Sequence, residues 1–181
     1  MSKAVMLSVR PKWCEKIISG EKTVEVRKNR PKLETPFKCY IYETQGWVEK
    51  DGIMEFGLGG RVIGEFTCDR IYELETRSPG GSYYVKGEGQ PTTNDVARQS
   101  CLTLKDMHEY LQAAKGYGWH ISDLKIYDKP RELREFKKNN RDCFYADLGP
   151  AKRDCPDCKN SGCFLERPPQ SWCYVEVTED V

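Results

Sequence analysis

The sequence lacks the segments that mark a membrane or secreted protein. Its apolar runs all fall short of the roughly 18–20 residues that a membrane-spanning helix needs. The first residues, MSKAVMLSVRP, hold too short an apolar stretch for a signal peptide. We therefore expect a cytoplasmic protein without a membrane partner. Disulfides are rare in that reducing compartment, so the nine cysteines are expected to be metal ligands or buried thiols.

An excess of one charge is also missing. The 29 basic and 28 acidic residues leave a net charge of +1, which excludes a globally basic nucleic-acid binder. The charge is unevenly spread, because residues 1–38 contain ten Lys or Arg and only four Glu. Basic residues are densest at 27–32. This cluster is either a solvated surface or a binding site for phosphates, and its charge alone leaves both interpretations open.

The length of 181 residues suits one domain spanning 1–181. Hydrophobic periodicity predicts a strand at 4–9 and then a helix at 12–19, which Pro11 opens and Gly20 stops. A capping box at Thr103 predicts a second helix, while 77–101 is expected to be loop and 128–136 a helical turn. Further strands are expected at 23–28, 38–44, 61–74 (one bent or two short), 116–127 and 171–178. This order favours an α+β fold, a small mixed β-barrel with a helix near the N-terminus.

One eight-residue stretch, Gly20–Arg27, has the pattern G-x-K-x-x-E-x-R. Strand alternation places Glu25 and Arg27 on one face, with Lys22 at the turn leading in. A carboxylate between two cations can accept a hydrogen bond from a base or a ribose hydroxyl while the cations hold phosphate oxygens. The structural alternative is a same-face ion pair that contributes about 0.2–1 kcal/mol.

With Leu7–Pro11 and a short helix before it, this motif resembles the ASCH domain family of the PUA-like superfamily. Residues 60–66, 116–121 and 168–175 are similar to later strands of that family, so the likeness covers about 4–136 and 168–177. The resemblance implies a β-barrel with a cleft beside the first helix that binds RNA or a nucleotide or nucleoside ligand. The residues expected to line this cleft are Arg10, Gly20, Lys22, Glu25, Arg27, Lys28 and Trp119.

Trp119 is included because the preceding Gly-Tyr-Gly is expected to place it at a turn, where a base could stack on it.

The resemblance also implies an alternative function, hydrolysis. Some similar proteins are small amidohydrolases acting on acetylated cytidine, in which the motif lysine activates and a threonine at the position of Glu25 is the nucleophile. Because Glu25 replaces that threonine here, an amidohydrolase or ribonuclease would need Lys22 or Glu25 in another catalytic role. His120 is a further candidate base, although a lone histidine in a strand is more often structural. A third interpretation is a protein-interaction adaptor with a vestigial cleft.

The polar segment 137–167 contains a cysteine cluster. Cys155, Cys158 and Cys163 form a C-x₂-C-x₄-C pattern, and thiolates at this spacing can share one tetrahedral zinc ion. Cys143 is the expected fourth ligand and Cys173 the alternative, so we expect a structural zinc in an insertion at 137–167. A labile disulfide, an unligated loop and an iron–sulfur centre are the alternatives. The remaining thiols are expected to be small buried hydrophobic groups: Cys14, Cys39, Cys68 and Cys101.

Overall fold

The computed structural model describes residues 3–50, 52–57, 59–76, 81–112, 115–138 and 164–178. The chain forms two compact units. The first unit comprises Met1–Lys12, Lys38–Phe66 and Lys125–Val181, and the second comprises Trp13–Phe37 and Thr67–Leu124. No helix in the described part of the chain is long and apolar enough to cross a membrane.

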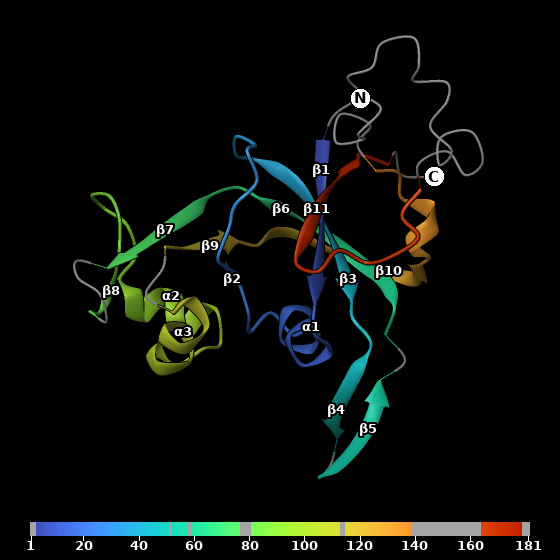
Figure 1. The fold of residues 1–181 in the computed structure, drawn as a ribbon, viewed down its shortest axis with the longest axis horizontal. Coiled ribbons are helices and arrows are strands. Elements are labelled where there is room, and N and C mark those ends of the chain that lie inside the picture. The colour runs from blue at the N-terminus through green and yellow to red at the C-terminus, as the bar shows by residue number, and fades with distance from the viewer. Residues whose placement is uncertain are drawn as a thin grey trace. The chain divides into compact units, whose positions relative to one another are not determined.

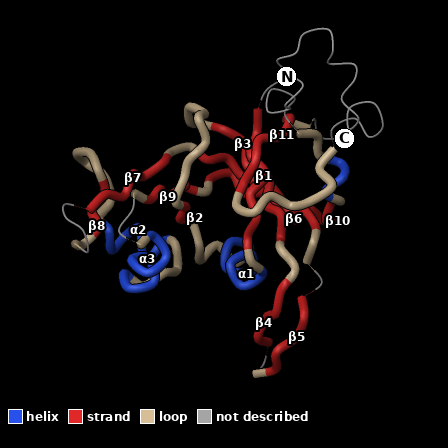
Figure 2. Tube along the Cα trace, in the orientation of Figure 1, coloured by secondary structure: helices blue, strands red, loops and turns tan. Residues whose placement is uncertain are grey.

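The first unit is built on a five-stranded mixed sheet (Figures 1 and 2). Its strands lie in the order β10 (Ser122–Arg131), β6 (Arg61–Cys68), β3 (Phe37–Glu43), β1 (Lys3–Val9) and β11 (Trp172–Glu176). Strand β1 pairs parallel with β3 and antiparallel with β11. Because Ala4–Leu7 are completely buried, the apolar run that predicts β1 suits a central strand covered on both faces.

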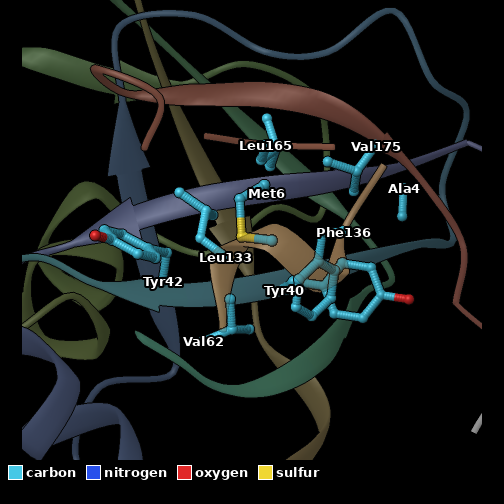
Figure 3. Packing of buried hydrophobic residues seen from close by; sticks show 9 residues of the cluster. All are labelled: Ala4, Met6, Tyr40, Tyr42, Val62, Leu133, Phe136, Leu165 and Val175. Atoms are coloured by element: carbon cyan, nitrogen blue, oxygen red, sulfur yellow. The ribbon is translucent and has the colours of Figure 1, made fainter. Parts of the chain in front are cut away.

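The core of this unit gathers side chains from distant segments. Figure 3 shows Met6 of β1 among residues of β3, the short 3₁₀ helix η1 (Leu133–Glu135) and β11. The rings of Tyr40 and Phe136 pack at a centroid separation of 4.8 Å. Residues on both sides of the undescribed segment 139–163 thus belong to one core, since Leu133 and Phe136 precede that segment and Leu165 and Val175 follow it.

A two-stranded hairpin, β4 (Gly46–Lys50) and β5 (Ile53–Gly57), connects β3 to β6 in the first unit. Gly52 adopts a φ of 78° at its turn, and Trp47 pairs with Phe56 across the strands. Figure 1 shows the hairpin extending beyond the ends of β3 and β6. Trp47, Ile53 and Phe56 are each more than half exposed, so these three side chains contribute little to the core.

The second unit has a four-stranded antiparallel sheet in the order β2 (Val24–Arg27), β9 (Gly116–His120), β7 (Ile71–Thr76) and β8 (Tyr83–Val85). Most of helix α1 (Pro11–Ile18) belongs to this unit, as do α2 (Thr93–Gln99) and α3 (Leu104–Leu111). Apolar side chains of the sheet pack with α2 and α3 in one cluster: Val24, Val26, Tyr72, Leu74, Tyr83, Val96, Ala97, Met107 and Leu111. Thr103 caps α3 through the predicted box with Asp106.

Three expectations from the sequence are corrected by the fold. Residues 77–101 contain strand β8 and helix α2, which begins with a second capping box at Thr92. The helical turn expected at 128–136 is confined to η1, because β10 continues to Arg131. The described strands form sheets of five, four and two strands, and no closed barrel is found among them. The fold is therefore mixed α+β, while most of the expected insertion, residues 139–163, lies outside the described residues.

Candidate functional site

The turn between α1 and β2 directs the motif lysine into the second unit. Gly20 follows α1 with a φ of 78°, a conformation that glycine adopts without the strain a side chain would bring. The backbone N–H of Lys22 then donates to the carbonyl of Lys16 over 2.8 Å. As a result, Lys22 is only 3% exposed even though the residue before it, Glu21, lies at the surface.

The ammonium group of Lys22 has an acceptor for each of its three N–H bonds. Its Nζ donates to the carbonyls of Val24 at 3.0 Å and Ser100 at 2.8 Å, and lies 3.1 Å from Oε2 of Glu25. The same Nζ lies over the Trp13 ring of α1, 5.1 Å from the centroid of the ring. Because Ser100 is the C-cap of α2, the cation also lies at the negative end of that helix. Lys22 is held as a buried cation and joins three segments of the unit.

Glu25 lies between the two cations of the motif. Its Oε1 is 2.9 Å from Nη2 of Arg27, its alternate neighbour on β2, and the Glu25 side chain is only 8% exposed. Burial alone would raise the pKa of the Glu25 carboxyl, but the charges of Lys22 and Arg27 and their hydrogen bonds hold that pKa below its usual value. The group is therefore a carboxylate at neutral pH, and the triad of Lys22, Glu25 and Arg27 carries a net charge of +1.

Exposure increases along the chain after this triad. The Arg27 side chain is 11% exposed, and the following residues Lys28 and Arg30 lie at the surface. Lys28 Nζ lies 5.5 Å from the centroid of the half-exposed Tyr110 ring of α3. Arg30 makes a longer contact, 3.5 Å, with Glu73 of β7. The segment thus runs from a fully bonded buried cation to cations that an anionic ligand can reach.

The family model that describes the ASCH domain matches residues 7–132, more than two thirds of the chain, and this range includes the whole triad. The chain belongs to the ASCH domain family. The expected family membership is therefore confirmed.

Solved ASCH structures show the same fold. A crystal structure of ASCH from Zymomonas mobilis is 18% identical over 96% of this chain and 87% of its own, with a TM-score of 0.55. A mutant of that protein gives 18% identity and a TM-score of 0.56 over 97% of this chain and 91% of its own. A search of curated proteins finds no match. At this identity the likeness extends to the fold alone.

The geometry of this ASCH domain brings together part of the expected set. Lys22, Glu25 and Arg27 are in contact, Gly20 forms the turn before them, and Lys28 follows at the surface. Arg10 is exposed and belongs to the first unit. All four expected metal ligands, Cys143, Cys155, Cys158 and Cys163, lie outside the described residues. In the part of the chain that is described, no group of three or more metal-binding side chains occurs.

The expected turn position of Trp119 is wrong. Trp119 lies inside β9, paired with Glu25 of β2 and Ile71 of β7, and is completely buried. The Phe37 ring packs against it edge to face at 5.9 Å. The two glycines of Gly-Tyr-Gly are strand residues here, and Gly118 leaves room for Val24, Tyr72 and Val96 around it. A base cannot stack on Trp119 in this conformation.

The sequence did not predict the partner of His120. Its Nδ1 lies 2.5 Å from Oδ1 of Asp69, while Nε and Nη2 of Arg70 donate to Oδ2 of the same carboxylate at 3.2 and 3.1 Å. Burial would raise the pKa of Asp69, and the bonds from His120 and Arg70 hold it below its usual value. No local pattern signals a contact between residues 51 positions apart. His120 pairs with Val24, so alternation places its side chain on the face opposite Glu25.

Proposed function

We propose that this ASCH domain binds RNA or a modified nucleoside through the exposed cations that follow the buried triad. The observation that carries the proposal is the ionised, buried Glu25, which fixes Arg27 at the start of an exposed basic segment. Family membership supports it, because the PUA-like family that includes ASCH domains is generally thought to bind RNA.

Within this proposal the motif residues have different roles. Lys22 already has three acceptors, so it positions Glu25 and the end of α2. Lys28 contacts the phosphate or carbonyl oxygens of the ligand from the surface, where its ammonium group can exchange solvent for these acceptors. Arg27, whose side chain is 11% exposed, contacts the ligand through the part of its guanidinium that Glu25 leaves accessible. Gly20, which has open space around its Cα, allows a close approach to the backbone of the turn.

The first experiment is a titration of the full chain with a ten-nucleotide single-stranded RNA and with single nucleosides over a range of salt concentrations. For RNA, log K should fall with log salt by about 0.7 per phosphate contact. Lys28→Ala should weaken binding and reduce that slope by about 0.7. Lys105→Ala removes a charge that is 84% exposed on α3 and serves as the matched control.

Equal effects of Lys28→Ala and Lys105→Ala would contradict the proposed path of the RNA. The absence of binding to every RNA and nucleoside would reject the function itself. Arg27→Lys adds a test of geometry, because it keeps the charge beside Glu25 and removes the planar fork that can hold two oxygens at once.

A second candidate function, ribonuclease activity, is favoured by the His120–Asp69 pair. A carboxylate next to Nδ1 favours the tautomer in which Nδ1 carries the proton, which leaves Nε2 of a neutral imidazole as the acceptor, and Arg70 provides a nearby exposed cation. In this reaction Nε2 takes the proton of a ribose 2′-hydroxyl, whose oxygen attacks phosphorus to form a 2′,3′-cyclic phosphate. The 5′-oxygen leaves and takes a proton from water or from the imidazolium. Cyclic-phosphate product that is formed by the wild type and lost in His120→Ala would support this activity; RNA left intact by the wild type would reject it.

A further inference from the structure

A cavity in the second unit lies away from the triad and has no role in the proposed function. It has a volume of about 360 Å³ and is formed by the start of β8, the first turn of α2 and the first turns of α3. Figure 1 shows these three elements grouped together within the unit. The volume falls at the lower end of the range of small-molecule sites, roughly 300–1,000 Å³.

The interior of the cavity is largely apolar. Met107 and Leu104 line the cavity from α3. The Met107 side chain is completely buried, and that of Leu104 is half exposed. The rings of Tyr83 and His108, 5.7 Å apart and steeply inclined at 71°, form an aromatic pair that also lines it. Thioether and aromatic groups of this kind pack well against a flat ring.

The polar groups around the cavity include no acid, lysine or arginine. None of the described residues that line it is Asp, Glu, Lys or Arg, so none of them provides a permanent charge to pair with a phosphate or a carboxylate. The hydroxyls of Thr92 and Thr93 already bond to Asp95 and to the carbonyl of Tyr83.

Three polar side chains remain available to a ligand. Ser82, Asn94 and His108 line the cavity, and their side chains have no hydrogen-bond partner within the described ranges. A hydroxyl, an amide and an imidazole together offer donors and acceptors, and groups of this kind can form hydrogen bonds with the edge of a nucleobase.

From these observations we infer that the cavity binds an uncharged nucleobase, packed on Met107 and the Tyr83–His108 pair and hydrogen-bonded by Asn94, Ser82 and His108. The base is either part of a free nucleoside or one base of an RNA strand; only the second source rests on the proposed function. Helix α2 connects the two sites, because Thr92 at its N-cap lines the cavity and the carbonyl of Ser100 at its C-cap binds Lys22. Eight helical steps separate these residues by about 12 Å.

The test is a titration of the full ¹⁵N-labelled chain with adenosine, guanosine, cytidine and uridine, followed by a titration with the ten-nucleotide RNA. At least one nucleoside should shift the backbone amide signals of Ser82, Asn94 and His108. Asn94→Ala should weaken that nucleoside's binding by roughly five- to tenfold, the effect of losing one hydrogen bond. Because Asn94 is exposed on the first turn of α2, this variant should fold normally.

Glu109→Gln is the matched control, since Glu109 is 66% exposed on α3 and does not line the cavity. Unchanged amide signals with all four nucleosides at 10 mM, or equal effects of Asn94→Ala and Glu109→Gln, would overturn the inference. RNA that shifts the amides of both Lys28 and Asn94 identifies the base as part of a strand. Nucleoside binding at Asn94, with neither RNA nor a nucleoside shifting the amide of Lys28, would reject the proposed function and keep the cavity as a nucleoside site.

Discussion

At the residue scale, the primary role of the motif lysine, Lys22, is structural. A free lysine could act as a base or bind a phosphate, but Lys22 uses its three N–H bonds on Val24, Ser100 and Glu25. Two of these acceptors are buried backbone carbonyls, which would lose this hydrogen-bond donor if Lys22 were absent. The same-face ion pair and the ligand site considered from the sequence are therefore compatible, because the buried pair fixes Arg27 for an external ligand.

Replacing Lys22 should destabilise the fold strongly. Lys22→Met leaves the Glu25 carboxylate with one cation and removes the donor from the two carbonyls, and breaking a buried pair in this way costs about 3–5 kcal/mol. Urea denaturation of Lys22→Met, Glu25→Gln and the double variant measures the loss of unfolding free energy. The double variant Lys22→Met/Glu25→Gln should lose less than the sum of the single changes, because the unpaired charge is gone.

Lys16→Met is the control for this series, since Lys16 pairs with Glu21 at the surface and should change stability by less than about 1 kcal/mol. Similar losses for Lys16→Met and Lys22→Met would show that the buried triad does not stabilise the unit.

The lowered pKa of Glu25 predicts a pH dependence of stability. A carboxyl whose pKa is lower in the folded than in the unfolded chain binds more protons when unfolded, so it adds stability above its ordinary pKa of 4.5. That contribution is lost as the pH falls from there through the folded-state pKa. Wild-type stability should therefore exceed that of Glu25→Gln at pH 7, and the difference should shrink below pH 4.5.

Chemical denaturation of both proteins between pH 7 and pH 3 gives the difference between their unfolding free energies. The contributions of the carboxylates that both proteins share cancel in this difference. A difference that stays constant or grows on acidification would show that Glu25 is not held as a carboxylate by Lys22 and Arg27.

At the element scale, the sequence predicts those elements whose signals are local. The apolar run of β1, the proline and glycine around α1, and the Thr103 capping box act within a few residues, and each element forms as expected. A helical turn was expected at 128–136, but Pro130 lies in β10, an edge strand of its sheet, which is where sheets tolerate a proline. That outcome depends on sheet order, which the sequence does not display.

The hairpin β4–β5 illustrates the same limit. The sequence contains its turn signal, Asp51-Gly52. The two strands pair with each other, but neither shows the strict alternation of apolar and polar residues that would identify it as a strand. Isolated two-stranded hairpins are only marginally stable in water. The edge-to-face pair of Trp47 and Phe56, with centroids 5.6 Å apart, is therefore a major contribution to its stability.

Trp47→Ser should loosen the hairpin without lowering global stability. Removing the aromatic pair costs about 0.5–1.5 kcal/mol of local opening free energy. Hydrogen exchange should accelerate by about three- to tenfold for amides of β4 and β5, while the urea midpoint stays unchanged. Phe136→Leu, which disrupts the buried ring pair with Tyr40, is the contrast and should lower the midpoint. A comparable loss of midpoint in Trp47→Ser would contradict the independence of the hairpin.

At the scale of the whole molecule, the candidate site was predictable only in part. Strand alternation is a local rule, so the sequence was enough to place Glu25 and Arg27 together. The Ser100 carbonyl lies 78 residues from Lys22, and Asp69 lies 51 residues from His120, so neither contact follows from spacing. The cavity also joins three separate elements, two of which, β8 and α2, were expected to be loop.

The cysteines fall into two groups, those in the described part of the chain and those in segment 139–163. Cys14, Cys39 and Cys68 are buried as expected, and Cys101 is partly exposed. Burial raises the pKa of the Cys68 thiol to about 12, so it is a poor metal ligand at neutral pH. The four expected metal ligands lie in segment 139–163, outside the described residues. Both ends of that segment are tied to one core, where Lys137 bridges Phe164.

We propose that the purified chain binds one zinc ion through Cys143, Cys155, Cys158 and Cys163. Metal analysis should give about one zinc per chain, a stoichiometry that follows from four thiolates around one tetrahedral ion. Cys158→Ser should lower this content strongly, whereas Cys101→Ser should leave it unchanged. Cys143→Ser and Cys173→Ser identify the fourth ligand, because only the true ligand's loss lowers the content. Chelation should then increase proteolysis within 139–163, since zinc binding supplies folding free energy there. Metal-free protein, or equal zinc in Cys158→Ser and the wild type, would reject the zinc site and favour a disulfide or an unligated loop.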